Sequence, residues 1–129
     1  MAKKEFSFRG KSLSELNEMK IEEFAELCTS RARKSLKKGF DKKMLKRIEK
    51  VKGKENPKPL KTHSRDLIVI PKMVGIKFSV HKGNGFEQVE ITEGMLGHYL
   101  GEFAFTRKRL RHGKAGIGAT RSSTAITAR

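Results

Sequence analysis

Residues 76–91 have the sequence IKFSVHKGNGFEQVEI, and this stretch decides how the middle of the chain folds. Apolar and polar residues alternate from 76 to 81, which is the pattern of a half-buried β-strand. The KGNG sequence at 82–85 contains residues that tolerate the positive φ angles of tight turns. Alternation then resumes over 88–91. The stretch therefore predicts a β-hairpin.

The segments that flank this hairpin contain further apolar residues. Residues 67–70 form a short apolar run directly before a proline. After the hairpin, Thr92 is placed to cap a short helix that continues to Leu96. We expect Phe103 and Phe105, which follow two glycines, to return to the core.

The chain before residue 30 shows a helical pattern. Ser12 is followed three residues later by Glu15, which is a capping-box sequence for the start of a helix. Apolar residues recur at helical spacing, so the sequence predicts helix over 12–28 with a break near Lys20. Cys28 would lie beside the apolar face as a small buried hydrophobic side chain.

Two basic helices are predicted next. Ser30 is a start signal for a cationic helix over 31–38, and Gly39 suits its end. Apolar residues recur at helical spacing among lysines over 41–52, which predicts an amphipathic basic helix. A loop is expected over 53–59.

Positive charge is concentrated in two blocks of the 129-residue chain. Lys and Arg total 30 against 14 Asp and Glu, so the formal net charge is +16 and the isoelectric point is about 10.3. Residues 31–65 have a net charge of +12 and residues 106–129 one of +7, whereas 1–30 and 66–105 are close to neutral. Like charges repel unless an opposite charge neutralises them, so this distribution predicts a polyanionic partner.

The same boundaries divide the chain into three parts. They are an N-terminal helical extension (1–30), a core with basic helices (31–105) and a basic, glycine-containing tail (106–129). A chain of this length holds one modest hydrophobic core. The tail has no acidic residue and no apolar period, so we expect an extended segment that a partner orders.

The sequence contains no clear motif for catalysis, metal binding or membrane insertion. Cys28 is the only cysteine, and the four histidines lack the spacing of a metal site. Lys114 is followed by Ala115, where a nucleotide-binding loop requires Ser or Thr. No cofactor motif, secretory signal or apolar run of roughly 20 residues occurs. We therefore expect a cytoplasmic protein without enzyme activity, cofactor, metal or membrane contact.

Four motifs in order resemble one known family. They are RKSLKKGF at 33–40, KPLKTHSR at 58–65, IPKMVG at 70–75 and MLGHYLGEF at 95–103. In this order and spacing they resemble the universal small-subunit ribosomal protein family nineteen, whose eukaryotic members are numbered fifteen. The N-terminal extension and the tail are similar to the archaeal and eukaryotic branch.

The resemblance implies an α+β domain in the head of the small subunit. It implies a small, mostly antiparallel, three-stranded sheet with flanking short helices, basic N-terminal helices and an extended C-terminal tail. The implied partners are the small-subunit ribosomal RNA, the neighbouring head protein numbered thirteen and, through the tail, A-site transfer RNA near the decoding site. An autonomous homo-oligomer is not expected.

Backbone contacts with RNA need Lys ammonium and Arg guanidinium groups, which neutralise phosphates or bind them bidentately. The RNA-binding candidates in the basic blocks and motifs are Arg33, Lys34, Lys37, Lys38, Lys42, Lys43, Lys46, Arg47, Lys58, Lys61, His63, Arg65, His98, Arg107, Lys108 and Arg121. Two alternatives remain open at this point. A non-ribosomal DNA-compacting protein would accept any duplex, and a small RNA-modifying enzyme would need an acid–base pair.

Overall fold

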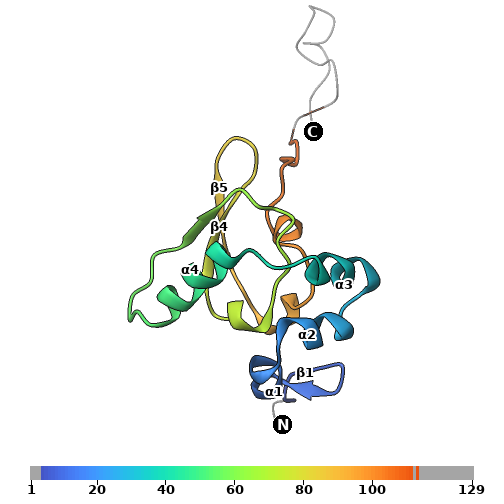
Figure 1. The fold of residues 1–129 in the computed structure, drawn as a ribbon. Coiled ribbons are helices and arrows are strands. Elements are labelled where there is room, and N and C mark those ends of the chain that lie inside the picture. Colours follow the sequence, from blue (N-terminus) through green and yellow to red (C-terminus); the bar gives the residue numbers. More distant parts are fainter. Residues whose placement is uncertain (1–3, 112, 114–129) are drawn as a thin grey trace, which may run out of the picture.

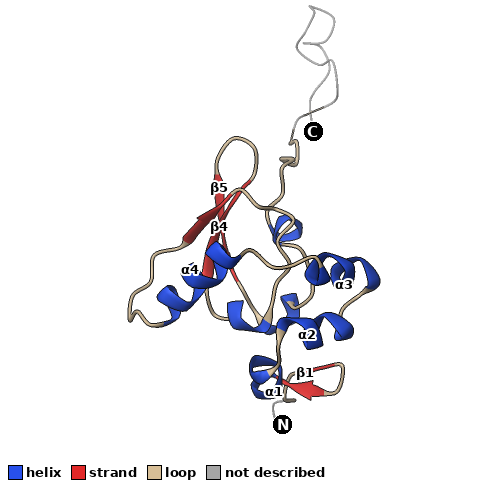
Figure 2. Cartoon of the chain, viewed as in Figure 1, coloured by secondary structure: helices blue, strands red, loops and turns tan. Residues whose placement is uncertain are grey.

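The larger sheet of the computed structural model, which describes residues 4–111 and 113, has three strands (Figure 1). The strands are β3 (Leu60–Thr62), β4 (Lys77–His81) and β5 (Phe86–Glu90), in that spatial order. In Figure 2, α4 (Lys42–Lys52) lies beside this sheet and the other helices lie below it and to its right, while the β4–β5 turn projects away from them. The α+β class that the sequence predicted is confirmed.

The hairpin predicted from residues 76–91 is confirmed. β4 and β5 pair antiparallel, with Phe78 opposite Val89. Across the turn, the Lys82 N–H donates a hydrogen bond of 2.8 Å to the Gly85 carbonyl. Gly83 has a φ of +104°, a conformation that residues with a side chain rarely adopt.

The third strand lies where the sequence showed no strand pattern. β3 pairs parallel to β4, whereas the apolar run at 67–70 forms only an isolated bridge from Ile68 to Tyr99. Three residues are too few to show alternation, and only the pairing partner reveals them as a strand. Elsewhere, β1 (Ser7–Phe8) and β2 (Lys11–Ser12) pair antiparallel, so the strand pairings of the described residues are mostly antiparallel.

The predicted N-terminal helix is interrupted, as expected near Lys20. It consists of α1 (Leu13–Glu18) and α2 (Ile21–Leu27). At the start of α1, the Ser12 N–H donates a hydrogen bond of 3.1 Å to the Glu15 carboxylate, which is one half of the predicted capping box.

The two basic helices form close to the predicted ranges. α3 (Ser30–Lys37) begins one residue earlier than predicted, with Thr29 as its N-cap, and Gly39 follows its end with a φ of +115°. α4 (Lys42–Lys52) begins after Asp41, whose carboxylate accepts a hydrogen bond of 2.9 Å from the Lys43 N–H.

One hydrophobic cluster unites the helices and the sheet. Its fully buried side chains include Phe24 of α2, Ile48 of α4 and Phe78 of β4. Met44 and Val51 lie four and three residues from Ile48 and are also buried, so α4 buries one stripe and exposes its lysines. Burial of a large apolar side chain contributes about 1.5–3 kcal/mol, which anchors this basic helix to the core.

Two single-residue predictions for the core had different outcomes. Cys28 is buried, as expected, and the loss of hydration raises the pKa of its thiol to about 11. Phe103 packs against the core cluster, but Phe105 is 74% exposed, so its predicted return to the core is wrong. The short helix Leu100–Phe103 ends before Phe105, and the chain then leads away from the core (Figure 1).

Candidate nucleic-acid interface

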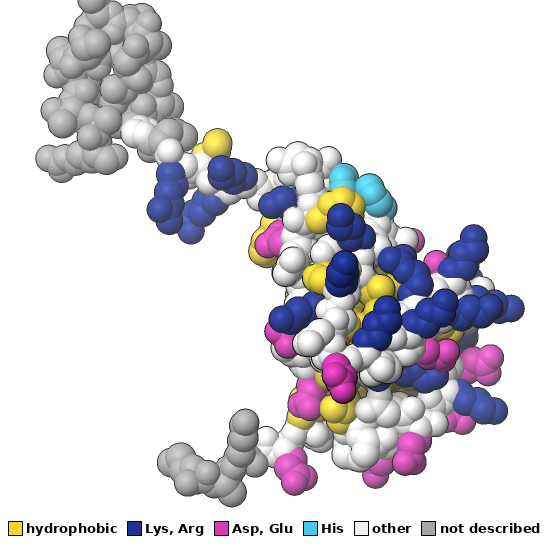
Figure 3. All heavy atoms as spheres, turned by 90° about the vertical axis from the view of Figure 1, so that its left-hand side faces the viewer, with side chains coloured by type: hydrophobic (Ala, Val, Ile, Leu, Met, Phe, Trp, Pro, Cys, Tyr) yellow, Lys and Arg dark blue, Asp and Glu magenta, His cyan; other side chains and the backbone are white. Residues whose placement is uncertain are grey.

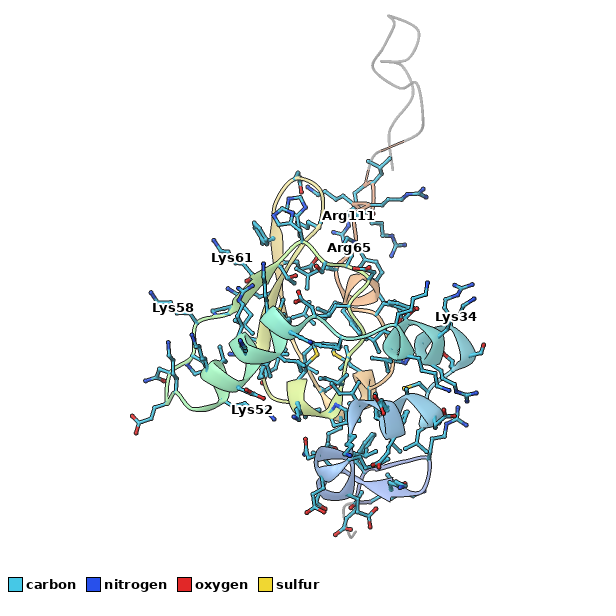
Figure 4. The ribbon with its side chains drawn as sticks, in the orientation of Figure 1. Lys34, Lys52, Lys58, Lys61, Arg65 and Arg111 are labelled. Carbon is cyan, nitrogen blue, oxygen red and sulfur yellow. The ribbon has the colours of Figure 1, made fainter. Side chains whose placement is uncertain are left out.

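The basic block over 31–65 covers two separate surfaces. Figure 3 shows the side formed by α4, β3 and the loop between them, where Lys and Arg side chains gather over the middle of the molecule. Asp and Glu side chains on this face lie mostly toward the N-terminal end. Figure 4 shows Lys58 and Lys61 on the α4 side, whereas Lys34 of α3 lies on the opposite side.

A groove of about 430 Å³ lies on the α4 side, and all but one of its lining residues carry a cationic or polar group. It is lined by Arg47, Lys58, Pro59, Lys61, Ser79 and Gln88. Arg47 donates a hydrogen bond of 3.1 Å from Nη2 to the Lys61 carbonyl, which ties α4 to β3. The structure thus brings together three predicted RNA-binding residues from a helix, a loop and a strand.

The lysines of α4 extend this cationic surface. All of these side chains are exposed, and they belong to Lys42, Lys43, Lys46, Lys50 and Lys52. In the part of the chain that the structure describes, none of them forms an ion pair with a carboxylate. Burial lowers the pKa of Lys52, and the charge of Lys72 lowers it further. The sequence alone did not reveal this pair, because Lys72 lies 20 residues after Lys52 and has no basic residue next to it.

The cations of α3 have a different environment, because a carboxylate of α2 lies beside them. Glu26 Oε1 is 2.6 Å from Lys37 Nζ, and Glu26 Oε2 is 3.6 Å from Arg33 Nε. Arg33 Nη2 also donates to the carbonyl oxygens of Glu26 and Cys28, at 3.2 and 3.4 Å. The Lys37 hydrogen bond and charge hold the pKa of Glu26 below its ordinary value of 4.5. Lys34 and Lys38 on this side are exposed.

Arg65 points into the fold and joins the hairpin to the C-terminal segment. Its Nη1 donates to the His81 carbonyl at 2.7 Å, and its Nη2 donates to the carbonyls of Gly101 and Ala104 at 2.7 and 2.6 Å. A Cβ atom at Gly101 would lie 2.9 Å from the Arg65 carbonyl oxygen, so this approach requires glycine. Arg65 has a structural role that its position in a basic motif did not reveal, and its contact with RNA stays a prediction.

The two predicted histidines lie in different places. His63 is exposed after β3 and stacks on His81, with ring centroids 4.2 Å apart. His98 is exposed, and its Nδ1 lies 2.8 Å from Glu102 Oε2, so this ring nitrogen has a hydrogen-bond partner within the fold. Among residues 4–111 and 113, no group of three or more His, Cys, Asp or Glu side chains could hold a metal ion.

The remaining predicted residues belong to the C-terminal part of the chain. Arg107 and Lys108 are exposed, and Figure 4 shows Arg111 at the same end of the molecule as the β4–β5 turn. Arg121, like almost all of the predicted tail after Arg111, lies outside the described residues. No helix within the described ranges is long and apolar enough to cross a membrane.

The fold and surface define a small α+β protein with a cationic groove and a cationic helix on one side, an arrangement typical of nucleic-acid-binding proteins. Residues 31–112 match the family described as ribosomal protein S19. The small ribosomal subunit protein uS19 of Halorubrum lacusprofundi is 47% identical over 124 residues, covering 93% of this chain and 88% of that protein. The chain therefore belongs to the ribosomal protein S19 family, as the four motifs indicated. Proteins of this family are ribosomal components and are not normally enzymes.

Proposed function

We propose that this chain is a structural component of the small ribosomal subunit and binds small-subunit ribosomal RNA through the α4 side. The observation that carries the proposal is the convergence of Arg47, Lys58 and Lys61 in one groove. Guanidinium and ammonium groups there can bind phosphate oxygens. The name of the relative from Halorubrum lacusprofundi supports the assignment to the small subunit.

The chemistry of the groove fits recognition of an RNA backbone. Side chains cannot read the deep, narrow major groove of an A-form helix, so proteins contact its phosphates and its shape. The α4 lysines continue the cationic surface beyond the groove and would contact further phosphates along the same strand or helix. We infer a cytoplasmic location within ribosomes from this role.

Three finer parts of the proposal rest on the resemblance of the motifs. They are a position in the head of the small subunit, contact with the head protein numbered thirteen, and a tail near the decoding site and its A-site transfer RNA. Exposed Arg107, Lys108 and Arg111 support an RNA environment where the tail begins.

Salt dependence of binding tests the backbone contacts. The protein is titrated with the head domain of small-subunit ribosomal RNA at increasing salt. If about seven phosphates are engaged, the slope of log affinity against log salt should be about −5 or steeper, because each contact releases counter-ions. A slope shallower than about −2 would contradict the proposal. Equal affinity for a DNA duplex of the same length would favour the DNA-compacting alternative.

Truncation tests the role of the tail. A chain that ends at Arg111 keeps every described helix and strand, so it should fold and join small subunits. We expect those subunits to bind A-site transfer RNA more weakly than subunits with the full chain. Failure to join the subunit, or normal transfer-RNA binding and fidelity after joining, would contradict this role.

A further inference from the structure

Three rings form a cluster at the hairpin end of the sheet. His63 follows β3, His81 ends β4 and Phe86 begins β5. The His63 and His81 rings stack, with centroids 4.2 Å apart and an interplanar angle of 24°. Phe86 meets them edge-on, at 5.3 and 5.1 Å. His81 and Phe86 are opposite each other in the β4–β5 register, so the hairpin itself holds two of the rings together.

The cluster is open to solvent. Phe86 is 40% exposed, although a large apolar ring at a strand end is commonly covered. His63 is also exposed, whereas His81 is half-buried. One face of the His63 ring lies against His81, which leaves its outer face as the place where another flat ring could continue the stack. Histidine side chains are visible in Figure 3 at one end of the cationic face, beside apolar and cationic groups.

Backbone hydrogen bonds hold this cluster in place. The Gly83 N–H donates to His81 Nδ1 at 3.2 Å, which sets the orientation of that imidazole. The Arg65 guanidinium holds the His81 carbonyl at 2.7 Å. A ring surface that is already oriented loses little conformational freedom when a ligand stacks on it.

Lys61 connects the cluster with the groove. Its Nζ lies 5.4 Å from the centroid of the Phe86 ring, and the same residue lines the groove together with Arg47 and Lys58. A strand whose phosphates lie in the groove would therefore bring its next nucleotide to the rings.

We propose that His63, His81 and Phe86 form a platform on which one unpaired nucleobase of an RNA stacks while its backbone lies in the groove. Unpaired bases stack on aromatic and imidazole faces, and every base has such a face, so the platform needs no hydrogen bond to a base edge. This inference rests on the proposed function and adds a base contact to an otherwise backbone-directed surface.

Two RNA probes separate the base contact from the phosphate contacts. One is a strand of about ten 2-aminopurine ribonucleotides, a length within the range that single-strand binding sites cover. The other has the same sugar and phosphate groups but no bases. The protein has no tryptophan, so 2-aminopurine fluorescence reports stacking without interference from an indole. We expect the wild-type protein to quench this fluorescence and to bind the base-bearing strand about tenfold more tightly.

Matched variants then identify the platform. His63→Ala removes the exposed ring and should abolish both the quenching and the tenfold preference, whereas His63→Phe keeps a flat ring and should retain them. Phe86→Leu preserves apolar contact but removes the edge-on ring, and it should weaken the preference. Phe105→Ala is the control, because Phe105 is an exposed phenylalanine outside the cluster. None of these changes should alter the salt dependence of binding to the abasic strand.

The outcomes distinguish this inference from the proposed function. Equal wild-type affinity for the two strands, with steep salt dependence, would overturn the platform and leave the backbone contacts intact. A preference that survives His63→Ala would also overturn it. Absence of binding to either strand at low salt would count against both proposals.

Discussion

Helices α3 and α4 are both cationic and both bury one apolar stripe, yet the fold uses their charges differently. On α3, Arg33 and Lys37 lie beside Glu26. On α4, no cation is paired with a carboxylate from the described residues, and Arg47 lines the groove. A cation that is held by a carboxylate must give up that partner to bind a phosphate, whereas an unpaired cation only exchanges water.

The difference between these helices shows that formal charge overstates the charge that is free for a partner. Residues 31–65 have a net charge of +12, but the block contains cations that stabilise the fold and cations that are open to solvent. Arg65 belongs to the first group, since it bonds to three carbonyls. Lys58 and Lys61 belong to the second. Substitutions in the first group should therefore mainly lower stability, and substitutions in the second should mainly lower RNA affinity.

The largest expected effect is on the stability of the Arg65→Ala variant. Loss of the guanidinium leaves carbonyls of the hairpin and of the C-terminal segment without a donor, which should lower the free energy of unfolding by about 3 kcal/mol. Denaturant unfolding followed by circular dichroism measures this change. Lys58→Ala removes an exposed cation from the same block and should change stability by less than about 0.5 kcal/mol. Similar losses in the two variants would contradict the division into two groups.

The next effect is on RNA affinity and compares two double variants. Lys58→Ala with Lys61→Ala removes two unpaired groove cations and should weaken binding to the RNA head domain by about 2 kcal/mol, roughly 30-fold. Arg33→Ala with Lys37→Ala removes the same formal charge, but the loss of binding free energy should be less than half as large. Fluorescence anisotropy at a fixed salt concentration measures both affinities. An equal loss for the two pairs would mean that the ion pairs with Glu26 do not limit RNA binding.

A smaller effect is expected when Glu26 loses its charge. Glu26→Gln removes the carboxylate charge beside Lys37 and Arg33, although Arg33 keeps its hydrogen bonds to backbone carbonyls. The variant should therefore bind RNA about twofold more tightly, beyond any general effect of charge. Glu22→Gln is the matched control, because Glu22 is an exposed carboxylate on the same helix. Fluorescence anisotropy again measures the RNA affinity. An equal gain in affinity for both variants would show that the affinity depends only on net charge.

The smallest expected effect is a pH dependence of the contact between α2 and α3. The pKa of Glu26 is lower in the folded protein than its ordinary value of 4.5, so its contribution to stability is complete above that value. This contribution to stability is lost as the pH falls through the pKa that Glu26 has in the folded protein. The stability of the wild-type protein should therefore decrease more below pH 4.5 than that of Glu26→Gln. Parallel curves for the two proteins would argue against the ion pair.

Local sequence patterns predicted much of the fold. Alternation over 76–91 predicted the hairpin, and caps and apolar spacing predicted the helices and the break near Lys20. β3 was missed because three residues acquire a strand conformation only through pairing with β4. Phe105 was misplaced because its hydrophobicity does not reveal that the chain leaves the core directly after buried Ala104.

The candidate site was predictable in composition but not in arrangement. The sequence located the basic residues, including Arg47, Lys58 and Lys61, but their convergence depends on the packing of α4 against β3. The pairing of Glu26 with Lys37 could not be predicted from the sequence either, because it depends on the angle between α2 and α3. In the same way, the hairpin pattern pairs His81 with Phe86, but the position of His63 beside them depends on the pairing of β3 with β4.

The most direct test of the account is to measure the acetylation rate of each lysine by mass spectrometry, with and without the RNA head domain. If RNA lies along the α4 side, Lys46, Lys58 and Lys61 should be strongly protected. Lys11 and Lys20, in the N-terminal segment, should react at unchanged rates. Protection of these N-terminal lysines together with unchanged reactivity at Lys58 and Lys61 would contradict the proposed interface.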